Sequence, residues 1–275
     1  MNIKETLQFI QTNNYQAPPD AFPLAQDMLL HIGSIDAELR DDLIYTTFSH
    51  WIPGDVLSVP ELEQLLLTTL DTDHLHYKLG EQGTDSVFTR SFSMLIVPLL
   101  LIRHRASPFL SQEQIHEVKK KVLYSIQEER DYRGYDEDKG WAHAIAHGAD
   151  ALDDLAQCSE LEHKDLMDIL HLIHSKMTIT DRVYSDGEDE RMVRAVISVL
   201  NRRLLSKDDV ERWIQYFYEA KVSASTDFLP AFRQKNNIKN FLKSLYFQVK
   251  FHQTDAALCP VIEQTLYQVD SVYYG

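Results

Sequence analysis

Apolar residues recur at intervals of three and four along almost the whole chain, which is the spacing of one face of an α-helix. Alternating apolar and polar runs long enough for β-strands are hard to find. Capping residues, glycines and prolines interrupt the pattern and mark the ends of segments. Together they predict an N-terminal helix followed by helices over residues 19–31, 35–52, 59–79, 85–105, 112–130, 139–157, 161–176, 187–204, 207–221, 226–250 and 255–272.

The order of these segments suggests their arrangement. From residue 19 onward the predicted helices fall into pairs, with a repeat of about 40 to 50 residues, the period of stacked helical hairpins of the HEAT and armadillo kind. We therefore predict an all-α fold and a single domain over residues 1–275, in which antiparallel helix pairs stack into a HEAT/armadillo-like α-α superhelix. An irregular helical bundle is the alternative fold.

Charge and apolar runs restrict the class of partner. The 275 residues include 42 acidic and 27 basic side chains, a net charge of −15, which repels nucleic acids and anionic membranes. The longest apolar run, residues 92–102, is too short to cross a bilayer and predicts a buried core helix. Two cysteines and the lack of a continuous apolar N-terminal run favour the cytoplasm. We expect no nucleic-acid partner and no membrane partner.

One segment, residues 131–155, stands apart in its chemistry. On the expected helix, His143, His147, Asp150 and Asp154 follow one another at i, i+4, i+7 and i+11, so they form one polar stripe opposite an apolar stripe. Two imidazoles and a carboxylate in this arrangement can share one divalent cation. His143, His147 and Asp150 are therefore candidate metal ligands. A polar ligand-binding cluster and an ordinary solvated face are the alternatives.

Small residues surround the two histidines. Glycine and alanine occupy positions 140, 142, 144, 146, 148 and 149. Gly148 costs about 1 kcal/mol of helix stability relative to alanine, so we expect a neighbouring helix or a ligand to approach closely there.

The stretch from Arg133-Gly134 through Lys139-Gly140-Trp141-Ala142-His143 to Asp150 resembles the signature of a bacterial family known as domain of unknown function 2785. Residues 88–93 and residues 187–191 are similar to two further stretches of that family, in the same order. The resemblance covers most of the chain. It implies a helical fold and a shared site, and it implies no activity.

The predicted pairing brings these three stretches together. The helices that begin near Asp85, Lys139 and Gly187 are each the second of a pair, so a solenoid would align them on its inner surface. Their polar side chains would line one groove. The candidate ligand-binding residues of this groove are Arg90, Ser93, Arg133, Lys139, Trp141, His143, His147, Asp150, Glu188 and Arg191.

Such a groove permits three interpretations: ion pairs without a ligand, a polar-ligand site, or a metal site. Arginine forks favour a carboxylate or phosphate ligand. Our first hypothesis is a binding scaffold whose groove holds a small anionic molecule or a protein partner. The alternative is a metal-dependent hydrolase, in which His143 and His147 are ligands, Asp150 or Glu188 is the third ligand or base, and Arg90 or Arg191 holds the substrate anion. The sequence leaves open whether the protein is an enzyme.

Overall fold

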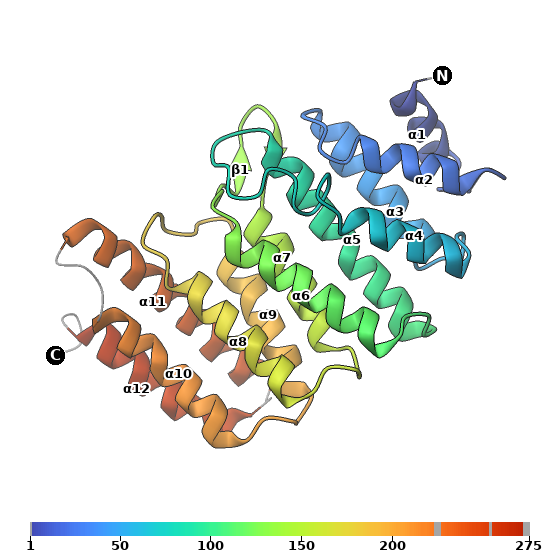
Figure 1. Cartoon of the computed structure of the whole chain (residues 1–275). Coiled ribbons are helices and arrows are strands. Elements are labelled where there is room, and N and C mark those ends of the chain that lie inside the picture. The colour runs from blue at the N-terminus through green and yellow to red at the C-terminus, as the bar shows by residue number, and fades with distance from the viewer. Residues whose placement is uncertain (1, 223–226, 253–254, 272–275) are drawn as a thin grey trace. The chain divides into compact units, whose positions relative to one another are not determined.

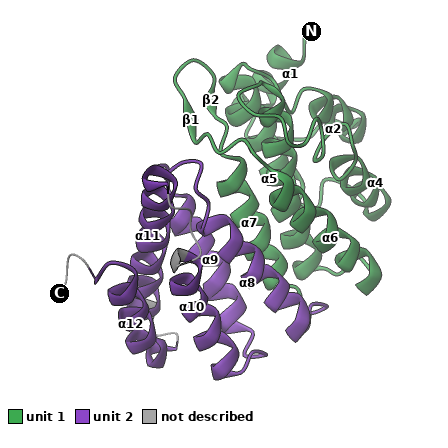
Figure 2. Ribbon diagram, turned by 60° about the vertical axis from the view of Figure 1, so that its left-hand side comes forward, with its two compact units in different colours: residues 1–158 green, residues 159–275 purple. Residues whose placement is uncertain are grey.

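The computed structural model describes residues 2–222, 227–252 and 255–271, and the predicted all-α fold is confirmed there (Figure 1). The chain forms two compact units, residues 1–158 and residues 159–275 (Figure 2). Compact units within one chain can belong to one domain, so the single domain stays a prediction, as does the stacking into a superhelix.

Unit 1 contains the whole of the segment with unusual chemistry, residues 131–155. The helix that begins at Gln112 starts with a capping box, in which Gln114 N donates to Ser111 Oγ at 3.2 Å and Ser111 N donates to Gln114 Oε1 at 2.7 Å. The elements of unit 1 are α1 (Ile3–Thr12), α2 (Ala21–Leu30), the π-helical η1 (Glu38–Tyr45), α3 (Thr46–Trp51), α4 (Val59–Thr69), α5 (Ser86–Ala106), α6 (Gln112–Glu128), β1 (Tyr135–Asp136), β2 (Gly140–Trp141) and α7 (Ala144–Ala156).

The core of unit 1 is built around α5, which packs along α7. Among the described helices, α5 is the one with the length and mean hydropathy of a membrane span, and 83% of that apolar window is buried in the protein. This burial is typical of the core helix of a soluble protein and confirms the predicted core helix. On α7, a Cβ added to Gly148 would lie 2.9 Å from Ile126 of α6, so the close neighbour expected at this glycine is a packed helix.

Two predicted helices are shorter in the structure. The helix expected over residues 59–79 ends at Thr69, because residues 70–85 form turns that side chains of α5 and of the segment after α6 hold in place. The helix expected over residues 139–157 begins only at Ala144, because Gly140 and Trp141 pair with β1. His143 adopts a left-handed conformation with φ of 49°, which separates the hairpin from α7.

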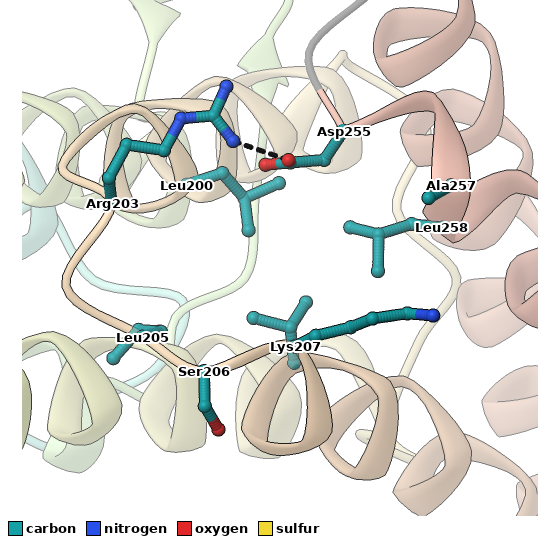
Figure 3. Close-up of a pocket in the computed structure, with 9 residues that line it drawn as sticks. Leu200, Arg203, Leu205, Ser206, Lys207, Asp255, Ala257 and Leu258 are labelled. Atoms are coloured by element: carbon teal, nitrogen blue, oxygen red, sulfur yellow. Dashed lines mark hydrogen bonds and ion pairs between the residues drawn. The ribbon is translucent and has the colours of Figure 1, made fainter.

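Unit 2 consists of amphipathic helices around a core that includes Trp213, Phe217 and Phe241. A cavity of about 170 Å³ opens at the end of α9, between the turn into α10 and the start of η2 (Figure 3). The elements of unit 2 are α8 (His163–Met177), α9 (Glu188–Asn201), α10 (Lys207–Val222), α11 (Phe228–His252), η2 (Ala256–Leu258) and α12 (Cys259–Val269).

Candidate functional site

Arg90 lies on α5 and is only 1% exposed. Its Nε and Nη2 donate to the two carboxylate oxygens of Glu129 at 2.7 and 2.9 Å. The other hydrogen bonds of the guanidinium, at 2.8 to 3.3 Å, go to Ser86 Oγ and to the carbonyl oxygens of Tyr77, Lys78 and Glu81. All five N–H groups are therefore used inside unit 1, which leaves none for the substrate anion that the sequence assigned to this residue.

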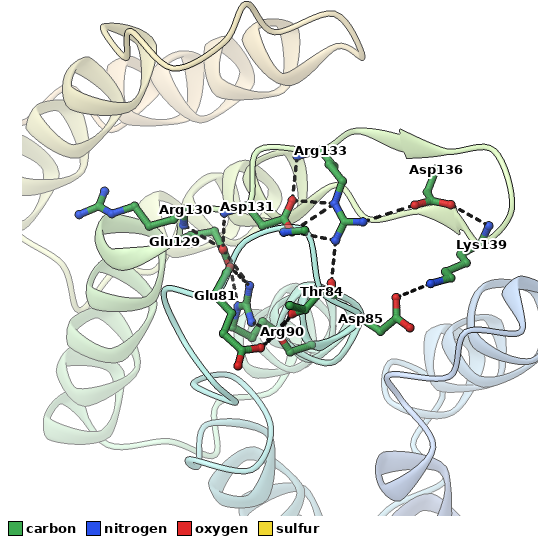
Figure 4. Close-up of polar contacts among 12 residues, drawn as sticks. Glu81, Thr84, Asp85, Arg90, Glu129, Arg130, Asp131, Arg133, Asp136 and Lys139 are labelled. Carbon is green, nitrogen blue, oxygen red and sulfur yellow. Dashed lines mark hydrogen bonds and ion pairs between the residues drawn. The ribbon is translucent and has the colours of Figure 1, made fainter.

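Arg133 is paired in the same network, which Figure 4 shows. Its guanidinium donates to both carboxylate oxygens of Asp131, with the shortest distance at 2.7 Å, and to Thr84 O at 2.6 Å. Burial disfavours the charged form of Asp131, but hydrogen bonds from Arg133 and from backbone N–H groups outweigh it and hold the pKa of Asp131 below its ordinary value. The pair fixes the start of the hairpin to the loop before α5.

The other arm of the hairpin is fixed by Lys139 and Arg40. Lys139 Nζ lies 2.6 Å from Asp85 Oδ1, and Lys139 O accepts a hydrogen bond of 2.8 Å from Arg40 Nη2. Arg40 is fully buried between the rings of Phe88 and Phe92, with its Cζ 4.4 and 4.7 Å from the two centroids. The predicted cations Arg133 and Lys139 thus have acidic partners inside unit 1, as the interpretation without a ligand requires.

Aromatic rings run from the surface of the hairpin into the core. Tyr135 and Trp141 are register partners in the β-ladder, with their rings in edge contact at 4.8 Å and with exposed fractions of 50% and 40%. Trp141 stacks on the buried His143 at 4.3 Å. His143 in turn meets the ring of His147 at 5.7 Å. The exposed aromatic pair therefore packs on two buried histidine rings, those of His143 and His147.

Two of the predicted site residues, Ser93 and His147, are buried in the interior of unit 1. His147 is buried, its Nδ1 lies 2.7 Å from Ser91 Oγ, and its ring contacts the ring of Phe92 at 5.1 Å. Ser93 is also buried, and its Oγ has no hydrogen-bond partner in the part of the chain that the structure describes. Both residues lie between packed helices rather than on an open face.

The predicted metal ligands do not form a ligand set. Within residues 2–222, 227–252 and 255–271, no group of three or more His, Cys, Asp or Glu side chains is arranged to hold a metal ion. His143 precedes α7 and stacks on Trp141, so the stripe expected on one helix is interrupted at its first member. Asp150 lies partly buried on α7. Because a hydrolytic metal site requires several protein ligands, the hydrolase hypothesis lacks a ligand set among the described residues.

The two remaining candidates, Glu188 and Arg191, belong to unit 2. Glu188 begins α9, is 1% exposed, and accepts a hydrogen bond of 2.9 Å from Asp186 N. Burial raises the pKa of Glu188. Arg191 lies half-buried one turn further along α9. The ligand-binding roles of Glu188 and Arg191 stay predictions.

Sequence reasoning missed the residues that complete the network: Arg40, Glu129 and Asp131. For Arg40 a signal existed, because it shares a helical face with Ile44, Thr47 and Trp51, where a lone arginine needs buried partners. No comparable spacing links Arg90 to Glu129, which lies 39 positions away.

The exposed end of the hairpin is acidic. Residues 131–139 carry four acidic and two basic side chains, and both basic ones pair with carboxylates of unit 1. The Asp136 carboxylate accepts hydrogen bonds from Asp138 N and Lys139 N at 3.1 and 3.2 Å, which shapes the turn. Glu137 and Asp138 are exposed in the turn that joins the strands of Tyr135 and Trp141.

Comparison with known proteins places the geometry in a family. The family model described as protein of unknown function (DUF2785) matches residues 75–247, more than half of the chain. This range includes the Arg90 network, the hairpin, α7 and α9. No curated protein and no solved structure matches the chain.

Proposed function

The chain belongs to the DUF2785 family, and from that premise, which carries no activity, we propose that it is a binding protein. Its binding surface is the hairpin platform, defined as the exposed rings of Tyr135 and Trp141 together with the acidic turn at residues 136–138. Its partner is a cationic segment of another protein. The observation that carries the proposal is an exposed aromatic pair on a hairpin whose turn exposes the carboxylates of Glu137 and Asp138.

The chemistry of the hairpin platform favours a cation. The face of a tryptophan or tyrosine ring attracts a guanidinium or ammonium group, and an adjacent carboxylate adds a charge-assisted hydrogen bond. Glu137 and Asp138 supply such carboxylates in the turn that joins the strands of the two rings. A small anion is less suited to this surface, because Arg90 has no free N–H group and Arg133 is already paired.

Preorganisation adds to this support. Arg133 and Lys139 hold the two arms of the hairpin through their side chains. Arg40 of η1 adds a hydrogen bond to the backbone carbonyl of Lys139. A surface that is already ordered loses little conformational entropy when a partner binds. Tryptophan and tyrosine are among the residues that contribute most of the binding energy at protein interfaces.

Tryptophan fluorescence offers a direct test. Trp51 and Trp213 are completely buried, whereas Trp141 is 40% exposed, so quenching from solvent reports on the hairpin platform. The probe is a short peptide alternating arginine and alanine, at about 0.15 M salt. We expect the peptide to shield Trp141 from acrylamide. The matching glutamate and alanine peptide should not.

Variants separate the hairpin platform from the general acidity of the protein. Measured by peptide anisotropy, Tyr135→Ala with Trp141→Ala should weaken binding about tenfold or more. Phe9→Ala, which removes an aromatic ring of α1 that is 63% exposed, is the control and should leave binding unchanged. Equal affinities of the Tyr135/Trp141 variant and the Phe9 control, or equal binding of the two peptides, would overturn the proposal. Circular dichroism of each variant verifies that the fold is intact.

A charge-matched comparison tests the acidic turn. Glu137→Gln with Asp138→Asn should weaken binding of the arginine peptide several-fold. Glu113→Gln with Glu117→Gln removes the same charge from exposed positions of α6 and serves as the control. If both pairs weaken binding equally, the peptide senses only the net charge, and the turn has no specific role.

A further inference from the structure

The cavity in unit 2 has the form of a small amphiphile site. Its lining comes from the end of α9, the turn into α10 and η2, and its volume is about 170 Å³. Leu200, Val210 and Leu258 are buried side chains of this lining, so they supply an apolar floor. We propose that this cavity binds a small organic carboxylate, with its hydrocarbon part on the floor and its carboxylate at the rim.

The rim carries two cations and one anion. Arg203 forms an ion pair with Asp255, and Lys207 lies 3.3 Å from Glu211 through its Nζ. Figure 3 shows the Arg203 and Asp255 pair on one side of the space and Lys207 on the other. Within the described chain, the Arg203 side chain is 61% exposed and makes this one hydrogen bond, so its remaining N–H groups are free for a ligand.

Volume and charge together define the ligand. An apolar protein cavity of about 150 Å³ holds a benzene molecule, so this floor suits a hydrocarbon part of about six carbons. A carboxylate at the rim would accept hydrogen bonds from Arg203 and Lys207, in the geometry for which a guanidinium is best suited. An amine of the same size would instead meet two cations. Asp255 competes with the ligand for Arg203.

The backbone at the rim fits a role beyond packing. Arg203 and Asp255 both have left-handed backbone conformations, with φ of 56° and 52°. Such conformations are unfavourable for residues other than glycine and are found at ligand sites more often than elsewhere. The exposed ion pair joins these two residues across the opening, where a ligand carboxylate would replace one of the partners.

A series of ligands with one tail and different heads tests the proposal. The probes are hexanoate, hexan-1-ol and hexylamine, titrated into the full chain and followed by ligand-observed NMR. Hexanoate should bind at least several-fold more tightly than hexan-1-ol, and hexylamine should bind most weakly. Equal binding of hexanoate and hexan-1-ol would overturn the assignment of a carboxylate, and no binding of hexanoate would overturn the site.

Substitutions locate the binding. Arg203→Asn with Lys207→Gln should weaken hexanoate binding about tenfold, and asparagine is chosen because it tolerates the left-handed backbone. Asp255→Asn should strengthen binding, because it removes the competing carboxylate. Lys243→Gln with Lys250→Gln, two exposed positions of α11 outside the cavity, is the control for charge. Equal loss in the control pair would contradict the proposal.

A second variant does not depend on the ion pair. Ala257 lines the cavity from an exposed position, so Ala257→Phe fills the space without removing a buried side chain. It should abolish hexanoate binding while the melting temperature stays close to that of the wild type. Retention of full affinity in this variant would place the ligand elsewhere. Because the hairpin platform lies in unit 1, Trp141→Ala should leave hexanoate binding unchanged, which separates this proposal from the proposed function.

Discussion

Each unit contains an arginine paired with a carboxylate, and the two pairs differ in how much of the guanidinium is used. In unit 1, Arg90 is 1% exposed and donates to a carboxylate, a hydroxyl and three backbone carbonyl groups. In unit 2, Arg203 is exposed and contacts one carboxylate. The contrast teaches that the number of occupied N–H groups separates an arginine that holds a fold from one that can receive a ligand.

The largest effect is expected where the buried pair is broken. Arg90→Gln leaves Glu129 charged, buried and without its main partner, so we expect the free energy of unfolding to fall by about 3–5 kcal/mol. Urea denaturation measures the loss. Glu129→Gln should cost a similar amount, and the double variant should cost clearly less than the sum of both. Additive losses would contradict the tight coupling of the two side chains.

A smaller effect is expected at the base of the hairpin. A Cβ at Gly140 would lie 3.0 Å from Ala37 Cβ and 3.2 Å from Arg40 Nη2, and the residue has φ of 77°. Gly140→Ala should therefore destabilise unit 1 by about 2 kcal/mol, through backbone strain and displacement of Arg40. Gly80→Ala, with φ of 95° and open space around its Cα, is the control for backbone strain alone. A loss no larger than that of the control would mean that Arg40 does not clamp the hairpin.

The pH dependence of stability should show an effect of a size similar to that of Gly140→Ala. Burial raises the pKa of Asp154 to about 6, despite its ion pair with Arg105. Because the folded state binds this proton more tightly than the unfolded state, stability falls as the pH rises from about 4 to about 6, by up to about 3 kcal/mol. Denaturation at pH 4 and at pH 7 measures it. In Asp154→Asn this component should vanish, and an unchanged pH dependence would contradict the assignment.

The exposed pair should give the smallest effect. Arg203→Asn should change the free energy of unfolding by no more than about 1 kcal/mol, because exposed ion pairs contribute little. The measurement is the same denaturation used for Arg90→Gln. A loss comparable with that of Arg90 would show that the Arg203 pair also serves the fold, and the contrast between the units would then fail.

The helices could be predicted because their periodicity is local. The segments expected over residues 85–105 and 187–204 begin within about one residue of α5 and α9, where apolar spacing and caps agree. The predicted start of the helix over residues 139–157 was wrong, because Trp141 pairs with Tyr135 in a short β-ladder instead of joining the helix. The spacing of apolar residues does not reveal this pairing. The left-handed backbone conformation of His143 could not be predicted from the sequence either.

The sequence predicted which side chains of the candidate site lie together better than it predicted their contacts, and their ligand-binding role stays a prediction. The sequence directed attention to Arg133, Lys139, Trp141 and the two histidines, and these residues lie together around the hairpin of unit 1. Which groups were already paired could not be predicted, because the partners of Arg90 and Arg133 come from turns and loops whose positions depend on tertiary packing. Exposure of the aromatic pair also depends on that packing.

The hydrogen bond between Arg40 and Lys139 O has a consequence for the order of folding during synthesis of the chain. Arg40 and its acceptor, Lys139 O, are separated by 99 positions. A ribosome adds about 5–20 residues per second, so Arg40 emerges roughly 5–20 s before the group that it finally binds. During that interval the hydrogen bond from Arg40 to Lys139 O cannot form, and the guanidinium has only its nearer partners, Ser34 O and Asp41. The contact between η1 and the hairpin is therefore made only after residue 139 has left the ribosome.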